Sequence, residues 1–419
     1  MRKSTAGHKN IGIGTGVILM EKLFYQDPYI QTFNTTLAKQ AQDEAGKWYA
    51  TLEQTAFYPK GGGQPYDTGT LNDQKVIEVQ EINGEIRHYL DQPFSEATKD
   101  VAGNIDWERR YDHMQQHAGQ HLLSAAFEEL FSYKTKSFHL GKEVSTIDLA
   151  TTGLTEQEVL EAESLVNRII LENRKIETKW VTKDELSDYP LRKELSVSEN
   201  IRLVIIPEFD YNGCGGTHPH STGGVASLKI LSLEKQKNMI RVSFVAGNRV
   251  LKQLHDKQQV LSELSSLLNA PQNGMGVAVT RILDQSKEQA KELKDMKEKL
   301  LEYEAAALVS QKELVSGRTI IKSVLKNREM AELQSMARKL VSARDDINVF
   351  LVAENVGKLQ FVGARGSDSD INMKFIANKV FAFINGKGGG RENFVQGGGE
   401  TTLTGEEVLE KITHIITND

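Results

Sequence analysis

The chain has 419 residues, of which 39% are hydrophobic and 26% charged, and its formal net charge is −6. This length allows two to four domains with packed cores, and the negative balance argues against a strongly basic, non-specific nucleic-acid binder. The single cysteine excludes a disulfide framework and favours the reducing cytoplasm, and no apolar run approaches the length of a membrane span.

The first 105 residues divide into a leader and a β-rich segment. Residues 1–19 contain scattered glycines and no convincing secretory pattern, so we expect a disordered leader or a mis-assigned start before Met20. From residue 20 to residue 105, short apolar segments alternate with turn residues, as at 48–52 and 76–79. This alternation is typical of β-strands.

A glycine-rich motif interrupts these strands. Residues 55–65 read T-A-F-Y-P-K-G-G-G-Q-P. Three consecutive glycines let the backbone approach a ligand closely or adopt positive φ. A plain hairpin turn explains the same residues, so both interpretations stay open.

Residues 106–246 carry two pairs of potential metal ligands. His117 and His121 form H-A-G-Q-H in a helical pattern over 109–131, and positions i and i+4 share one helix face. Cys214 and His218 form C-G-G-T-H in a glycine-rich segment that can bend around an ion. Three imidazoles and one thiolate are a plausible tetrahedral Zn²⁺ site.

Other patterns in this segment limit the kind of zinc site. His113, His139 and His220 are rival ligands. Ala118 follows His117 where a peptidase needs glutamate, and the zinc-deaminase motifs do not occur. The remaining expected elements are a helix at 155–174, strands at 143–149, 203–206 and 240–244, and a loop at 137–141.

Residues 248–315 show apolar residues at three- and four-residue spacing on both sides of a breaker at Pro271–Gly276. Because the break lies midway, the pattern predicts an antiparallel coiled-coil arm. Such an arm dimerises the chain or acts as a spacer.

Residues 317–419 alternate strand and helix patterns. We expect strands at 319–324, 348–353 and 359–363, and helices at 329–343, 371–384 and 405–417. Between the last two helices, glycine runs surround Lys387 and Arg391. Gly388, Gly389 and Gly390 can form an anion-binding nest, although the segment lacks the G-K-[ST] of a Walker loop. A flexible loop is the alternative, and Arg109–Arg110 is a second basic candidate.

Taken in order, these motifs resemble the long form of the AlaX proteins, free-standing relatives of the alanyl-tRNA synthetase editing domain. T-x-F-Y-P-x-G-G-G-Q precedes H-x-x-x-H and C-G-G-T-H, and the arm and G-K-G-G-G-R…Q-G-G-G follow. The resemblance covers nearly all of the chain after residue 19. The combined order is specific, whereas each motif alone is not.

The resemblance implies an α+β fold class. The domains that we expect are a disordered leader (1–19), an N-terminal β-barrel (20–105), an α+β zinc-containing editing domain (106–246), a helical coiled-coil arm (247–316) and a C-terminal α/β domain (317–419). The last resembles the DHH-associated domain that ends alanyl-tRNA synthetases and implies tRNA contact through Lys387, Arg391 and the glycines between them.

The activity that the resemblance implies is hydrolysis of tRNA(Ala) mischarged with serine or glycine. His117, His121, Cys214 and His218 match the family's zinc ligands. Thr55 matches the threonine associated with the serine hydroxyl, and Gln64 the glutamine of the active-site loop. Ala118 departs from the threonine of many relatives and leaves both ligands in place. We expect no aminoacylation activity, because little chain precedes the editing motifs.

Several alternatives remain open at this point. In one version zinc activates a water, although four protein ligands leave no position for it. In the other, zinc binds the substrate's amino group or positions the loop, and the tRNA's own hydroxyl helps to activate the water. We expect a homodimer through the arm or the C-terminal domain. The rival functions are a non-enzymatic zinc-stabilised RNA-binding protein and a DHH-class phosphoesterase, whose D-H-H motif the chain lacks.

Overall fold

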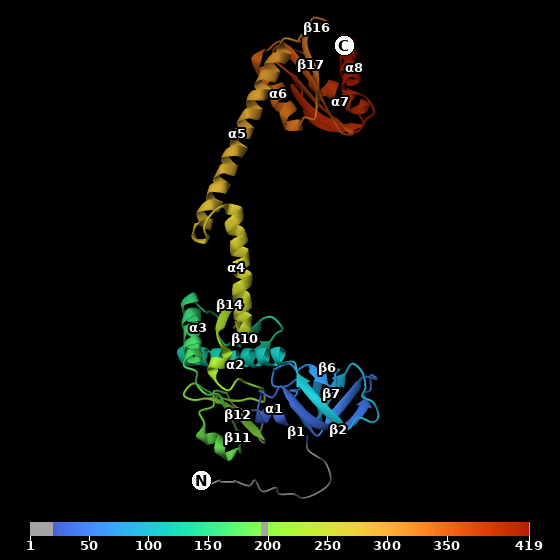
Figure 1. The fold of residues 1–419 in the computed structure, drawn as a ribbon. Coiled ribbons are helices and arrows are strands. Elements are labelled where there is room, and N and C mark those ends of the chain that lie inside the picture. The colour runs from blue at the N-terminus through green and yellow to red at the C-terminus, as the bar shows by residue number, and fades with distance from the viewer. Residues whose placement is uncertain (1–19, 194–199, 419) are drawn as a thin grey trace, which may run out of the picture. The chain divides into compact units, whose positions relative to one another are not determined.

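The computed structural model describes residues 20–193 and 200–418. It forms two compact units that divide after Glu263, and each is described here by itself (Figure 1). The expected leader at 1–19 lies outside the described residues. No helix in the described part of the chain is long and apolar enough to cross a bilayer.

Six antiparallel strands of the first unit pair in a closed ring, in the order β2, β3, β7, β6, β5, β8 and back to β2. They are β2 (Thr32–Gln42), β3 (Trp48–Leu52), β5 (Gly69–Leu71), β6 (Gln74–Ile82), β7 (Glu85–Leu90) and β8 (Asp100–Ile105). The Asn83–Gly84 turn joins β6 to β7 with positive φ at both residues, the geometry that suits a two-residue hairpin. Inward side chains such as Val79 and Ile86 are fully buried.

A short segment lies beside this ring. Strand β1 (Glu21–Lys22) pairs in parallel with β4 (Gln54–Thr55), and helix α1 (Leu23–Gln26) follows β1. This pairing fixes the backbone at Thr55, one end of the glycine-rich motif.

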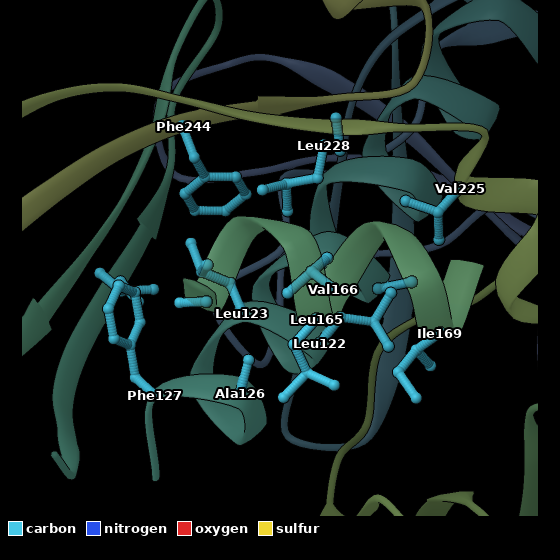
Figure 2. Close-up of a cluster of buried hydrophobic side chains, with 14 of the residues drawn as sticks. Leu122, Leu123, Ala126, Phe127, Leu165, Val166, Ile169, Val225, Leu228 and Phe244 are labelled. Carbon is cyan, nitrogen blue, oxygen red and sulfur yellow. The ribbon is translucent and has the colours of Figure 1, made fainter. Parts of the chain in front are cut away.

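Helix α2 (Trp107–Phe131) is the central helix of the first unit. Asp106 caps its N-terminus by accepting from the Arg109 N–H. Helix α3 (Glu156–Leu171) packs beside it and begins with a capping box formed by Thr155 and Glu158. Figure 2 shows the core between them and the adjoining sheet, including Leu122, Leu123, Ala126, Phe127, Leu165, Val166, Ile169 and Phe244.

Two antiparallel sheets complete this unit. One has the order β14 (Leu228–Gln236), β15 (Met239–Ala246), β10 (Ser145–Leu149), β9 (Thr135–Leu140), and the other is β11 (Glu177–Val181), β12 (Ile201–Ile206), β13 (Asp210–Gly213). Short 3-10 helices occupy Asp184–Asp188 (η1) and Thr222–Val225 (η2). The loop expected at 137–141 is wrong: residues up to Leu140 are strand β9, because the edge of β10 offers hydrogen bonds that local composition does not reveal.

Two long helices follow. Helix α4 is Asn248–Leu268, a 3-10 turn η3 occupies Gln272–Gly274, and helix α5 is Met275–Val309. Pro271 lies directly before η3, where the break was expected. No residue of α4 is buried. Pairing of these helices as a coiled coil stays a prediction.

The second unit ends in a six-stranded sheet in the order β16, β17, β18, β19, β21, β20. Its strands are β16 (Glu313–Val315), β17 (Arg318–Lys326), β18 (Ile347–Asn355), β19 (Lys358–Arg365), β20 (Gly386–Arg391) and β21 (Phe394–Gly399). Helix α6 (Met330–Ala343) belongs to one buried cluster, and α7 (Met373–Phe383) and α8 (Gly405–Thr417) belong to another. The three strands and three helices expected here are confirmed, and so is the mixed α+β class.

The glycine-rich segment of this unit differs from the expected loop. Residues 386–399 form the β20–β21 hairpin, with β20 at the sheet edge. The Phe381 ring of α7 packs against Gly388 and Gly397, where an added Cβ would overlap it. Gly388 and Gly397 are therefore explained by close packing against Phe381 and the backbone of the facing strand in an extended hairpin rather than by a nest.

Candidate metal centre

Four side chains from two segments of the first unit converge on one point. His117 and His121 extend from α2, and Cys214 and His218 lie in the segment after β13. One ligand atom from each lies within 4.8 Å of the others. The Cys214 Sγ is 3.4 Å from His117 Nε2 and 3.3 Å from His218 Nε2. Within the described residues, this is the cluster of histidine, cysteine and carboxylate groups that could hold a metal ion.

The local structure explains the convergence. The two α2 histidines are one turn apart and nearly fully buried, with ring centroids 5.2 Å from each other. Gly216 lies against the His117 ring, and a Cβ added there would overlap it. Glycine at this position therefore lets the C-G-G-T-H segment approach the helix closely.

Both α2 histidines have partners that orient them. His121 Nδ1 lies 2.8 Å from Asp210 Oδ2, and His117 Nδ1 lies 3.0 Å from Gln64 Oε1. An imidazole that donates through Nδ1 keeps the Nε2 lone pair for a metal. Gln64 and Asp210 therefore orient the two imidazoles as metal ligands.

Gln64 connects the glycine-rich motif to the ligand segment. Its Oε1 also accepts from the Thr217 N–H at 3.0 Å, and its Nε2 donates to Thr217 Oγ1 at 2.8 Å. The side chain is buried and touches His117 rather than the open pocket. This geometry suits a positioning role.

The electrostatics of the cluster shift the protonation of three of the ligands. Burial would raise the pKa of the Cys214 thiol, but the nearby His117 and His218 outweigh it and hold that pKa well below its usual value. Burial lowers the pKa of His218 to about 3. For His121, burial lowers the pKa, yet hydrogen bonds to Asp210 and Cys214 outweigh it and raise the pKa to about 9. A thiolate and a neutral imidazole are the forms that bind metal. The shifts at Cys214 and His218 therefore favour metal binding, whereas His121 must release a proton when a metal binds.

The cluster opens into a pocket of about 660 Å³. Four basic side chains line it, namely Lys136, Arg192, Lys193 and Arg202, and no carboxylate is among its described lining residues. In a chain with a net charge of −6, this concentration of positive charge is local. The pocket is suited to an anionic ligand.

Two arginines of this wall are only partly paired. Arg192 donates through Nε to Asp210 Oδ1 at 2.6 Å, and Arg202 donates through Nη1 to the carbonyls of Cys214 and Gly216. Arg192 Nη2 and Arg202 Nε are buried without a partner among the described residues.

Thr55 does not line this pocket. Its hydroxyl is fully buried beside the ring of strands and lies 2.8 Å from His88 Nε2, while His88 Nδ1 faces the Ala50 carbonyl at 3.1 Å. Burial lowers the pKa of His88 to about 4, so the imidazole is neutral at pH 7. The contact with serine that the resemblance implies for Thr55 stays a prediction.

Thr135, which sequence reasoning missed, lines the pocket with His117 and His121. Its hydroxyl donates to Ser124 Oγ at 2.9 Å, and Gln120 Nε2 donates to the same oxygen at 2.8 Å. The lone pairs of the Thr135 hydroxyl remain available to a ligand. Asp210 and Trp180 were missed as well, because no spacing pattern in the sequence links them to the ligand pairs.

The other predicted residues lie elsewhere. His220 stacks on Tyr29 at 4.1 Å and faces Asp27, and the buried His113 Nδ1 has no partner among the described residues. Lys387 and Arg391 are exposed on β20 of the second unit. Gly388, Gly389, Gly390 and Arg391 line a pocket of about 780 Å³ there with Arg338 and Arg365.

Two family models match the chain. The threonyl and alanyl tRNA synthetase second additional domain matches residues 201–243, a range that contains Cys214 and His218. The DHHA1 domain matches residues 316–418.

Curated relatives match most of the chain. The alanine–tRNA ligase of Pyrococcus furiosus is 31% identical over 407 residues, which are 93% of this chain and 43% of the ligase. The alanyl-tRNA editing protein AlaX-L of Pyrococcus horikoshii is 29% identical over 90% of this chain and 94% of its own length. The alanyl-tRNA editing protein Aarsd1 of Mus musculus is 29% identical with the same two coverages. This chain thus spans less than half of the ligase and nearly all of each editing protein.

Proposed function

Because this chain is homologous to the alanyl-tRNA editing proteins over 90% of its length, we propose that it hydrolyses the aminoacyl ester of mischarged tRNA(Ala). The proposed substrate carries serine, or glycine, in place of alanine, and the products are the free amino acid and free tRNA. The expected lack of aminoacylation activity stays a prediction. The cytoplasmic location expected from the single cysteine stays a prediction.

The observation that carries this proposal is a metal-ligand cluster at one end of a basic pocket. The four ligands fit zinc, because one thiolate and three imidazoles with oriented nitrogens form a common tetrahedral donor set. When bound, zinc supplies a positive charge that either acidifies a water or holds the substrate's amino group. Since four protein ligands leave no open position, either role would require one protein ligand, such as Cys214, to leave when the substrate binds.

The protein's own residues account for binding and selection. Lys136, Arg192 and Arg202 offer positive charge to the phosphates of the tRNA acceptor end. A pocket that discriminates only by side-chain size separates serine from alanine weakly, by roughly 10²-fold. A pocket that forms a hydrogen bond with the serine hydroxyl discriminates far better. We propose that a threonine hydroxyl reads the serine side chain, with Thr135 placed in the pocket and Thr55 as the residue that the resemblance implies.

We propose a homodimer through the helical arm or the C-terminal domain. Helix α4 exposes Leu251, Leu254 and Leu267 by 64%, 65% and 73%. Apolar side chains on a helix without a buried residue need a partner to leave water. Light scattering at micromolar protein tests this, and a monomer across the concentration range would contradict it.

Hydrolysis of Ser-tRNA(Ala) beside Ala-tRNA(Ala), by the wild type and by His117→Ala, tests the catalytic proposal. We expect rapid loss of serine only, abolished by the substitution. A well-folded, zinc-loaded wild type that binds tRNA but hydrolyses no mischarged substrate would instead support the non-enzymatic RNA-binding function.

A further inference from the structure

Trp180 is a large aromatic side chain that is not buried in the core of its sheet. It is 52% exposed, whereas the two other tryptophans of the chain, Trp48 and Trp107, are half-buried. Its neighbour Val181 is buried in the core of the β11–β12–β13 sheet. Because side chains alternate along a strand, Trp180 extends from the opposite face of β11.

Two neighbours hold the indole in place. The Trp180 and Tyr25 ring centroids are 5.5 Å apart at an angle of 83°, and the Arg202 guanidinium lies 4.9 Å from the Tyr25 ring centroid. Arg202 is also the direct pairing partner of Trp180 between β11 and β12. The perpendicular contact with Tyr25 positions the indole without covering it, and the cation–π contact of Arg202 holds the Tyr25 ring in turn.

The same residues border the metal-ligand pocket. Trp180, Tyr25 and Arg202 line it together with Cys214. Arg202 is 7% exposed and donates to the Cys214 carbonyl at 2.8 Å, so the support of the indole is bonded directly to the ligand segment. Its Nε is buried without a partner among the described residues.

We propose that Trp180 stacks on the 3′-terminal base of the tRNA and is a positioning residue for the hydrolysis. The inference rests on the proposed function. The ester to be cleaved and the terminal base are carried by the same ribose, so a pocket that receives the ester must also receive the base or let it project at the mouth. An exposed indole beside basic side chains is the surface that unpaired bases use in proteins that bind single strands.

The chemistry of the substrate excludes the amino acid itself as the partner of the indole. Serine and glycine side chains have no aromatic or large apolar surface to cover. The described pocket wall is basic and free of carboxylates, which matches a nucleotide with its phosphate better than an acidic or neutral peptide. The terminal base is therefore the occupant that both the aromatic surface and the charge support.

The test compares Trp180→Ala and Trp180→Phe in the full-length, zinc-loaded protein with a 3′-seryl minihelix as substrate. Stacking on an aromatic side chain contributes enough that its loss raises KM about five- to a hundredfold. Since stacking holds substrate and transition state alike, kcat changes little. Trp180→Phe recovers most of the wild-type KM. Leu171→Ala, which alters an 84% exposed side chain of α3, is the matched surface control.

A spectroscopic readout follows the base directly. A minihelix with 2-aminopurine as its terminal base and a non-hydrolysable seryl amide is titrated with each protein. We expect quenching on binding to the wild type and much weaker quenching with Trp180→Ala. Unchanged KM and unchanged quenching in Trp180→Ala would overturn the inference. If the wild type quenches the probe but hydrolyses nothing, the proposed function fails while the stacking stands.

Discussion

At the residue scale, Asp210 combines two functions that the sequence does not announce. Its carboxylate faces His121 Nδ1 through one oxygen and accepts from Arg192 Nε through the other. Burial raises the pKa of Asp210, but the bonds to His121 and Arg192 outweigh it, so the pKa lies below its usual value. The carboxylate therefore remains ionised, orients the imidazole and anchors one basic side chain of the pocket.

Replacing this carboxylate tests its link to the metal. We expect Asp210→Asn to weaken zinc binding about ten- to a hundredfold, because outer partners of ligating histidines contribute that much. Zinc affinity is measured by competition with a chromophoric chelator. Asp148→Asn, which breaks an ion pair with Arg241 in another sheet, is the control and should bind zinc as the wild type does. Equal affinities for all three proteins would contradict the orienting role.

A second prediction separates the two threonines. Thr135→Val should reduce kcat/KM for Ser-tRNA(Ala) about tenfold, the effect of one lost hydrogen bond to the substrate. Hydrolysis of Gly-tRNA(Ala) should not change, because glycine has no hydroxyl to bind. The comparison of the two substrates is the measurement.

Thr55→Val should act on the fold instead. Its buried partner His88 would lose a hydrogen bond, which lowers the free energy of unfolding by about 1–3 kcal/mol in urea denaturation. If Thr55→Val selectively abolished serine hydrolysis without loss of stability, the role that the resemblance implies for Thr55 would be supported over that of Thr135.

At the element scale, the β20–β21 hairpin shows how one composition permits different structures. Its glycines suit a nest, a flexible loop and an extended hairpin equally well when only local residues are considered. Contact with α7 favours the extended hairpin, since Phe381 occupies the space that side chains at Gly388 and Gly397 would take. The hairpin is therefore stabilised by packing rather than by intrinsic strand preference, which is low for glycine.

Neighbouring glycines provide a matched test. Gly388→Ala places a methyl group against the Phe381 ring and the backbone of Gln396 and Gly397, whereas the same change at Gly389 meets no atom within 4 Å. We expect Gly388→Ala to lower the free energy of unfolding of this unit by about 1–3 kcal/mol, the range for overpacking. Gly389→Ala should remain near the wild type. Denaturant unfolding of both variants is the measurement, and equal stabilities would show that the close packing at Gly388 is unimportant.

The element scale also shows where periodicity is sufficient. The boundaries of α2, α6 and α8 lie within two residues of the expected helices at 109–131, 329–343 and 405–417. Their apolar spacing and caps are local signals, because a helix satisfies its hydrogen bonds within four residues. Strand β9 was missed for the opposite reason: its partner β10 must already be in place.

At the scale of the whole molecule, the first unit holds the proposed chemistry and the second offers a separate basic surface. Lys387 and Arg391 are exposed on β20, and Arg338 and Arg365 share a pocket with Arg391. We propose that these residues contact tRNA phosphates. Each unit would then contribute binding energy to one substrate.

Replacing both exposed cations tests whether the second unit contributes to tRNA binding. The double variant Lys387→Ala/Arg391→Ala should bind full-length tRNA more weakly, and the slope of log affinity against log salt should fall by about one for each lost phosphate contact. Its kcat on a short seryl minihelix should match the wild type. Lys326→Ala, at the end of β17, is the control. Unchanged tRNA affinity and salt dependence in the double variant would remove the second unit's basic surface from the proposal.

The sequence by itself determined the features that depend on short separations. The i, i+4 histidines of α2, the C-G-G-T-H segment and the helices of the C-terminal domain were all readable from local spacing. The single cysteine added a strong clue, because it lies four residues from a histidine in a glycine-rich segment.

Only the tertiary structure decided which distant groups complete the site. Asp210 reaches His121 across 89 residues of chain, and Gln64 reaches Thr217 across 153. Thr135 and Trp180 enter the same pocket from the edges of two different sheets. No local pattern specifies such neighbours, because their proximity follows from strand pairing and from the burial of the α2 core, and these are properties of the whole chain rather than of any segment.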